Sequence, residues 1–204
     1  MANVSPSRAA QRLSAIWLSA ALPLASCTSL VFRPENVARP TTVYVLREAL
    51  HVGIVTPDPK GAPTRYVEYG YGDWAWYALG QESWWRVFPT VLWPTQATLC
   101  RRVWPARDEE ELARLLAQRG CEADAMQVEA ERVVEFASGM EARFASGAEA
   151  RRDELRMDFV KADGSYWFGN TCADVAADWC EQLGCDVGWV LIRGSLLVKR
   201  EAAR

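Results

Sequence analysis

The chain has 204 residues, half of them hydrophobic, and a formal net charge of −3 when its single histidine is counted as neutral. This length is enough for one domain with a well-buried core. The mild acidity and the lack of a basic tract argue against a nucleic-acid partner. A single histidine and the lack of a CxxC pair leave a metal ion without its usual ligand spacing, and no phosphate loop or nucleotide fingerprint is present. We therefore expect neither a metal nor a cofactor.

The first 27 residues have the pattern of an export signal. Arg8 and Arg12 form a short basic region, and Leu13–Leu24 is apolar but too short to span a membrane. Leu24-Ala-Ser-Cys27 then resembles a bacterial lipobox, in which the cysteine is acylated and becomes the first residue. The alternatives are an ordinary signal that is cut near Ala25 and a buried N-terminal helix.

These features predict the domain organisation. Residues 1–26 form a lipoprotein signal peptide, residues 27–40 a tether, and residues 41–204 a single α+β domain. Thr28, rather than an aspartate, follows the candidate lipidation site Cys27. We therefore expect a lipid-anchored protein of the cell envelope, at the outer membrane or the periplasmic face if the cell is Gram-negative.

The first part of the domain has the composition of β-strands, and Arg65–Tyr69 also alternates with a period of two. Strands are predicted at Thr41–Glu48, His51–Thr56 and Arg65–Tyr69, with Gly70–Asp73 closing the third. Pro57–Gly61 is a strong turn signal between the last two strands. The resulting hairpin would hold His51 and Glu68 on adjacent strands.

Residues 74–104 carry six of the ten tryptophans. We interpret them as packing in the core and around a groove. The alternatives are an aromatic wall over a substrate groove and a surface that lies against the membrane.

The rest of the chain predicts four helices and several strands. The expected helices cover 81–87, 108–118, 125–146 and 171–183, and the expected strands cover 97–103, 157–162, 189–192 and 195–198.

The helix predicted at 171–183 carries a candidate nucleophile. Asn170 or Thr171 is a suitable N-cap and Gly184 a suitable stop. Cys172 then lies in the first turn and on the apolar face. A helix start favours thiolate over thiol, and its unpaired N–H groups can hold an oxyanion, with Asn170 and Thr171 as supporting residues.

A thiolate at this position needs a proton-handling partner. The only imidazole in the chain is His51, which in turn needs a group that fixes its tautomer. We assign that role to Glu68, with Glu48, Asp73 and the amide of Asn170 as competitors. Glu48 lies an odd number of residues from His51, so on an unbroken strand it would point to the opposite face.

Cysteine counting also selects Cys172. If Cys27 is lipidated, five cysteines remain, and one must stay unpaired in an oxidising compartment. We expect Cys180 to pair with Cys185, and Cys100 with Cys121. The alternative is that all five are reduced structural cysteines.

These motifs together resemble a known group of enzymes. His51-Val-Gly-Ile on a strand, a carboxylate on the next strand and Asn170-Thr-Cys172 opening a later helix resemble the circularly permuted papain-like thiol hydrolases. That group includes permuted NlpC-type amidases and lecithin:retinol acyltransferase-like proteins. In ordinary members the cysteine helix precedes the histidine strand, and here the order is reversed. Retinoid-type members often use a second histidine, which this chain lacks.

A closer resemblance covers most of residues 41–198. Tyr66-Val-Glu-Tyr-Gly-Tyr-Gly-Asp73, Trp84-Trp85 and Asn170-Thr-Cys172 are similar to a bacterial family described as urease-region conserved proteins, a domain of unknown function. This resemblance implies no reaction.

The expected fold is α+β, with a small antiparallel sheet packed against the helix that bears Cys172, in a permuted papain-like arrangement. The expected function is cysteine-dependent hydrolysis or acyl transfer at an amide or ester. Its partners would be the lipid bilayer, through the acyl anchor, and cell-wall peptides or lipid acyl groups as substrates. The alternative is a non-catalytic envelope lipoprotein that acts as a binding module.

Overall fold

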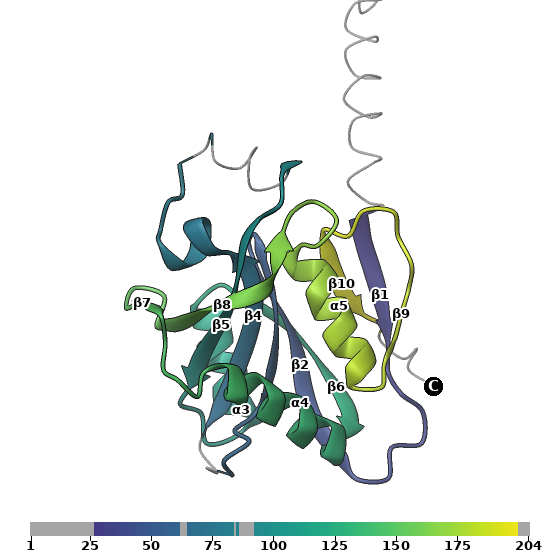
Figure 1. The fold of residues 1–204 in the computed structure, drawn as a ribbon. Coiled ribbons are helices and arrows are strands. Elements are labelled where there is room, and N and C mark those ends of the chain that lie inside the picture. Colours follow the sequence, from purple (N-terminus) through teal and green to yellow (C-terminus); the bar gives the residue numbers. More distant parts are fainter. Residues whose placement is uncertain (1–26, 62–64, 84, 86–91, 200–204) are drawn as a thin grey trace, which may run out of the picture.

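The computed structural model describes residues 27–61, 65–83, 85 and 92–199. Its centre is a seven-stranded sheet in which every neighbouring pair is antiparallel (Figure 1). In spatial order the strands are β6 (Glu122–Glu129), β2 (Pro40–Glu48), β3 (His51–Pro57), β4 (Tyr66–Asp73), β5 (Thr95–Trp104), β8 (Met157–Tyr166) and β7 (Ala150–Arg152). The fold is therefore a mixture of α and β structure around a large antiparallel sheet, as the α+β expectation requires in outline.

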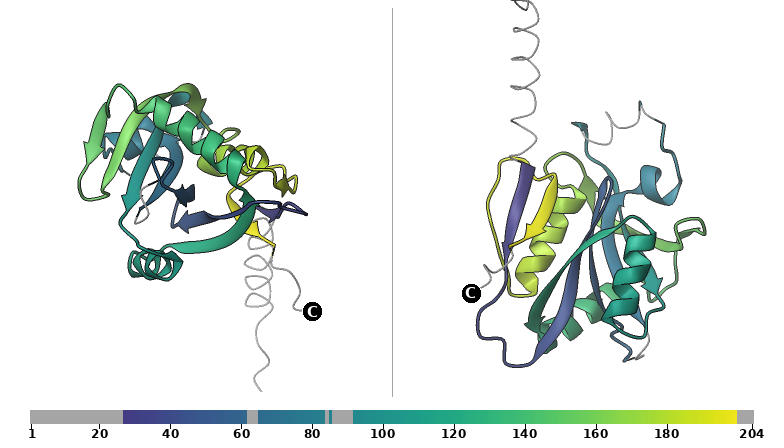
Figure 2. Two further views of the ribbon diagram at one scale, coloured as in Figure 1. Left: turned by 90° about the horizontal axis from the view of Figure 1, so that it is seen from below. Right: turned by 180° about the vertical axis from the view of Figure 1, so that it is seen from behind.

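Helices cover both faces of this sheet (Figure 2). Helices α4 (Ala130–Arg143) and α5 (Cys172–Gln182) pack on one face, whereas α3 (Glu109–Gln118) packs on the other. A short helical segment, η2 (Trp74–Ala78), follows β4 directly. The two faces therefore carry separate apolar clusters.

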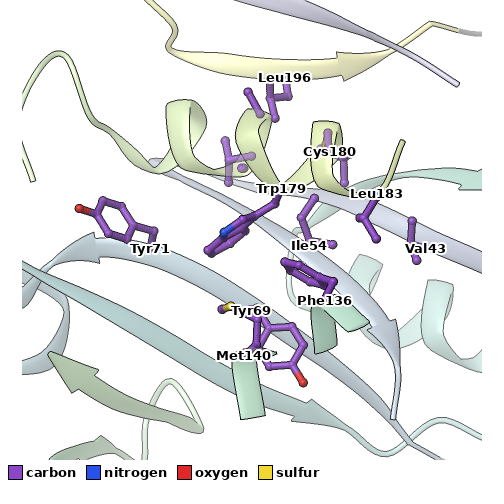
Figure 3. Close-up of a cluster of buried hydrophobic side chains, with 14 of the residues drawn as sticks. Val43, Ile54, Tyr69, Tyr71, Phe136, Met140, Trp179, Cys180, Leu183 and Leu196 are labelled. Atoms are coloured by element: carbon purple, nitrogen blue, oxygen red, sulfur yellow. The ribbon is translucent and has the colours of Figure 1, made fainter. Parts of the chain in front are cut away.

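The larger cluster fills the space between the sheet and helices α4 and α5 (Figure 3). Trp179 of α5 lies edge-on to Phe136 of α4, and Phe136 in turn lies edge-on to Tyr69 of β4. Ile54 of β3 belongs to the same cluster. This packing fixes α5 against β3 and β4 through aromatic contacts at ring separations of 5.7–5.8 Å.

A second, three-stranded sheet covers the outer side of α5. It consists of β10 (Ser195–Val198), β1 (Thr28–Phe32) and β9 (Asp186–Val187), with β1 in the centre. Val31 and Leu196 of this sheet are fully buried, and Figure 3 shows Leu196 on the side of α5 opposite Ile54. The expectation of a tether over 27–40 is therefore wrong for residues 28–32, because their apolar side chains pack on α5.

Other differences from the expected elements have tertiary causes. The sheet is larger than expected because β4 continues through Gly70–Asp73 and because residues 122–129 form β6 instead of the start of a helix. Residues 189–192 form a loop rather than a strand. The helix expected at 81–87 falls partly outside the described residues, and residues 81–83 are not helical. The expected strands at 97–103, 157–162 and 195–198 are present.

Candidate active site

The start of α5 holds Cys172 in a fixed place. Thr171 is the N-cap and forms a capping box with Asp174. The Asp174 N–H donates a hydrogen bond to Thr171 Oγ1, and the Thr171 N–H donates one to the Asp174 carboxylate. Gly184, with φ of 92°, stops the helix at its other end. The N–H groups of Cys172 and Ala173 are left without acceptors inside the helix. The cysteine side chain is 6% exposed.

A tight turn places His51 close to this helix start. Strands β2 and β3 are joined by the two residues Ala49 and Leu50, and Ala49 takes a positive φ of 37°. His51 is the first residue of β3 and is paired directly with Glu48 of β2. The imidazole is 7% exposed, so it is held within the protein.

The thiol and the imidazole come from different faces of the sheet. His51 shares its face with Val55, which packs in the α3 cluster, whereas Cys172 packs in the cluster on the α4 and α5 face. The two side chains meet around the end of the sheet, beside the Ala49–Leu50 turn. Both line one cavity of about 220 Å³, together with Arg47, Ala49, Leu50, Val52, Tyr166, Thr171, Arg193, Gly194 and Ser195.

The Leu50 carbonyl lies in the turn between the His51 strand and the start of α5. The Cys172 Sγ is 3.8 Å from this oxygen, and the Tyr77 hydroxyl donates to it at 2.9 Å. Neither nitrogen of the buried His51 ring has a hydrogen-bond partner. The thiol is therefore directed at the turn in this structure, while the imidazole lines the same cavity and has Glu68 as its ion-pair partner.

Two glycines make room for the imidazole. A Cβ on Gly70 would lie 2.5 Å from His51 Nε2 and 2.7 Å from Cys100 Sγ, and a Cβ on Gly53 would lie 3.3 Å from the same Nε2. The ring therefore lies across the backbone of β3 and β4, beside Cys100 of β5. Any larger residue at position 70 would displace it.

Beyond these glycines the ring approaches Glu68. His51 Nε2 is 3.6 Å from Glu68 Oε1, and Glu68 is fully buried. The carboxylate accepts from Arg102 Nε at 2.8 Å and Nη2 at 3.0 Å, and from Trp104 Nε1 at 2.8 Å. The Arg102 guanidinium also lies over the Trp104 ring. Glu68 is therefore clamped by three donors, with the imidazole at a fourth position.

The charges of this cluster set its titration. Burial alone would raise the pKa of Glu68, but the neighbouring His51 and the Arg102 guanidinium outweigh it and lower the pKa to about 2. Burial likewise disfavours the charged imidazole, but Cys100, Glu68 and the charge of Cys172 outweigh it and hold the pKa of His51 well above its usual value. The cluster therefore favours a carboxylate beside an imidazolium.

The expectation that Glu48 points to the opposite face of the sheet from His51 is wrong. The two-residue turn resets the alternation, so Glu48 faces His51 across the hairpin on the same side of the sheet. Its carboxylate instead accepts from Arg102 Nη2 at 3.0 Å and lies 3.3 Å from Arg119 Nε. Asp73, the other competitor, caps η2 by accepting from the Trp76 N–H at 2.6 Å. Of the three carboxylates, Glu68 makes the ion pair with the ring.

Asn170 and Thr171 have structural partners. The Asn170 amide donates to the Tyr71 hydroxyl at 2.9 Å and to the Ser165 carbonyl at 2.7 Å. Thr171 lines the cavity and caps α5. Support for an oxyanion from these two side chains stays a prediction, as do the catalytic roles of Cys172, His51 and Glu68.

The expected disulfides are not present. Cys100, Cys121, Cys172, Cys180 and Cys185 are all thiols, and Cys100 and Cys121 pack in different clusters. Cys185 Sγ contacts Met126 Sδ at 3.5 Å instead of Cys180. Burial raises the pKa of Cys121 and of Cys185 to about 11, and it also raises the pKa of Cys180. Only Cys172 among these five lines the cavity with His51.

Several residues of the site were not expected from the sequence. Tyr166 lines the cavity, and burial together with the charge of Cys172 raises its pKa. Arg193 donates to Ser29 Oγ at 2.8 Å and to Asp174 Oδ1 at 3.3 Å, which ties the cavity wall to the start of α5. The aromatic run at 166–168 marked this region in the sequence, whereas nothing local indicated Arg102 or Arg193.

Comparisons with known proteins add no assignment: no protein-family model matches the chain, and neither a curated protein nor a solved structure is significantly similar to it. Among the described residues, no group of three or more His, Cys, Asp and Glu side chains is placed to hold a metal ion.

Proposed function

We propose that the protein is a cysteine-dependent hydrolase or acyltransferase that acts on an amide or ester. The observation that carries this proposal is that the Cys172 thiol and the buried His51 imidazole line one cavity, with the Glu68 carboxylate 3.6 Å from the ring. A nucleophile, a base and an orienting carboxylate are the parts that acyl transfer through a thioester needs.

The roles follow from which nitrogen each neighbour approaches. Glu68 lies beside Nε2, so the neutral ring would carry its proton there and keep the lone pair on Nδ1. The raised pKa of His51 favours transfer of the thiol proton to Nδ1 before the attack, and the Cys172 thiolate beside the imidazolium then attacks the acyl carbon. The N–H groups of Cys172 and Ala173 hold the oxyanion. Collapse of the tetrahedral intermediate transfers the proton to the leaving amine or alcohol and leaves a thioester.

The second half of the reaction reuses the same groups. Water, or an acceptor alcohol or amine, loses its proton to Nδ1 and attacks the thioester carbon. The Cys172 sulfur then leaves and regains the proton. Glu68 stays ionised throughout because Arg102 and Trp104 fill its other hydrogen-bonding positions. This sequence is supported by the low pKa of Glu68 and the raised pKa of His51.

We extend the proposal to the fold and the location. A strand that begins at His51 and a later helix that begins at Cys172 support the permuted papain-like arrangement. The segment before Cys27 lies outside the described residues, and its sequence supports a lipoprotein anchored in the cell envelope. Within the described residues no helix is long and apolar enough to cross a bilayer. Cell-wall peptides and lipid acyl groups are the substrate classes that this location offers.

One observation favours the second candidate, a non-catalytic binding module of the envelope. The Cys172 thiol contacts the Leu50 carbonyl, and the His51 ring accepts no hydrogen bond from it. A thiol and a base can be close without reacting, although catalytic hydrogen bonds in unliganded enzymes are often long.

The test is acylation by a small activated thioester or ester, followed by mass mapping of the labelled cysteine. The proposed enzyme should form one stable adduct, on Cys172. The amount of adduct should fall to zero in C172S and at least tenfold in H51A. The matched control is C100S, because Cys100 also lies beside His51 but does not line the cavity. An adduct on Cys100, or equal labelling of several cysteines, rejects the proposed site in favour of the binding module.

A further inference from the structure

Exposed apolar side chains lie in the segments of the chain that line the Cys172 cavity. Trp189 and Leu191 are each 80% exposed, and Leu50 is 74% exposed. Three further side chains, Trp167, Phe168 and Ile192, are between 38% and 43% exposed. We call these six residues the apolar collar: Leu50, Trp167, Phe168, Trp189, Leu191 and Ile192.

The collar belongs to three segments that also line the cavity. Leu50 lies in the β2–β3 turn, whose residues 49–51 form one wall. Trp167 and Phe168 lie in the connection between Tyr166 and Thr171, both of which line the cavity. The loop 188–194 ends at Arg193 and Gly194, which form another wall. In Figure 1 the β8–α5 connection and the β9–β10 loop lie at the same end of the molecule.

Such a concentration of exposed apolar side chains has a cost in water. Isolated exposed apolar residues are ordinary, but six of them, two of which are tryptophans, in the segments that line one cavity are typical of a contact surface. Tryptophan beside aliphatic side chains is also the composition that lies at the interface between lipid and water.

The course of the chain identifies what covers the collar. The Gly194 N–H donates to the Cys27 carbonyl at 2.6 Å, so the first described residue lies against the collar loop. β1 begins at Thr28, which leaves no spacer between Cys27 and the folded structure. The candidate lipidation site Cys27 therefore joins the fold at this surface. A membrane that holds the N-terminal part of the chain would meet the collar first.

We infer that the apolar collar docks on the surface of a lipid bilayer, with the mouth of the Cys172 cavity at the lipid–water interface. This inference rests on the membrane location proposed above and does not depend on the thiol chemistry. The acylation test and the docking test can therefore fail separately.

The experiment is photo-crosslinking of the full chain in membranes of the producing cell. The crosslinker p-benzoylphenylalanine replaces either Leu191 of the collar or Val134 of α4. Val134 is 57% exposed, and α4 lies away from the β9–β10 loop in Figure 1. Adducts are identified by mass spectrometry. Docking predicts lipid adducts from position 191 at least tenfold above those from position 134.

A second pair of variants tests the surface as a whole. With the crosslinker at Trp167, the double change W189E/L191E should reduce lipid adducts at least fivefold, whereas the matched change V134E should leave them unchanged. Equal labelling from positions 191 and 134 would mean that the anchor alone holds a freely tumbling domain. That result, or adducts from position 191 to a protein instead of lipid, overturns the inference.

Discussion

The close approach of the imidazole to Gly70 yields a measurable prediction for Gly70→Ala. The new Cβ would lie 2.5 Å from His51 Nε2 and 2.7 Å from Cys100 Sγ, distances that no relaxed contact allows. Overpacking of this kind costs about 1–3 kcal/mol, and an alanine in a strand otherwise gains about 0.5–1 kcal/mol over glycine. The free energy of unfolding should therefore fall by about 0–2.5 kcal/mol.

The same substitution should alter the chemistry of Cys172. An unassisted thiol is about 3% ionised at pH 7, so displacement of the imidazole should slow alkylation of Cys172 by up to about 30-fold at that pH. At pH 10, where a thiolate forms without help, the rates of the two proteins should approach each other.

The assays are denaturant unfolding and mass-resolved iodoacetamide labelling. Gly139→Ala is the matched control, because a Cβ at that exposed position of α4 would meet no atom within 4 Å and should stabilise the helix by up to about 1 kcal/mol. If Gly70→Ala destabilises the fold but leaves labelling of Cys172 unchanged, the imidazole does not serve this thiol. If Gly70→Ala is more stable than the parent by about 0.5–1 kcal/mol, the gain of alanine over glycine is unopposed and the ring does not lie across β4.

Four further outcomes are expected. The pKa of Glu68 is about 2 in the folded protein and about 4.3 in the unfolded chain, so ionised Glu68 contributes about 3 kcal/mol of stability above pH 4.3, and this contribution is lost as the pH falls to 2. In Glu68→Gln the free energy of unfolding should therefore change less between pH 4.3 and pH 2 than in the parent, which urea titrations at both pH values will measure. Thr171→Ala should lower the free energy of unfolding by about 1 kcal/mol through loss of the cap, and an unchanged midpoint would contradict the capping box. Cys27→Ser should block lipoprotein processing and release the mature protein from the membrane fraction, and unchanged fractionation would count against the anchor. Cys172→Ser should fold with near-parental stability yet form no thioester, and an adduct retained on another residue would mean that Cys172 is not the nucleophile.

Local sequence signals were sufficient for the helix that bears the candidate nucleophile. A threonine cap, an acidic residue three positions later and a glycine stop define α5 within a few residues, and the structure contains all three. Strand β2 and strand β3, which begins at His51, were equally local, because each is rich in strand-forming residues and ends at a turn. These elements could be predicted because neighbouring residues determine them.

The face on which Glu48 lies could not be predicted by counting along the strand. A two-residue turn reverses the chain, and cross-strand partners then share a face whatever their separation in sequence. The prediction of a helix over residues 125–129 was wrong for a different reason. Their alanine, methionine and glutamine favour a helix, but pairing with β2 places Met126 and Val128 in the core, and burial outweighs propensity.

The partners of Glu68 depend on pairing between strands far apart in sequence. Arg102 lies 34 residues later and meets Glu68 directly through the β4–β5 register. No local pattern encodes that register, so the sequence indicated an orienting carboxylate without indicating what holds it. The predicted disulfide between Cys180 and Cys185 was wrong for a similar reason, because the Cys185 sulfur contacts Met126 of the distant strand β6 instead.

The way Glu68 is held determines which part of the site can move. Its carboxylate is fully buried and fixed by Arg102 and Trp104, so it cannot follow the imidazole. The glycine-bounded space over β4 in turn fixes the ring, and the capping box fixes the start of α5. The Ala49–Leu50 turn lies between the ring and the start of α5, and its Leu50 carbonyl accepts from Tyr77 and contacts the thiol. A productive contact between Cys172 and His51 therefore requires that the thiol rotate away from this carbonyl, which a substrate in the cavity can achieve without any change in the sheet.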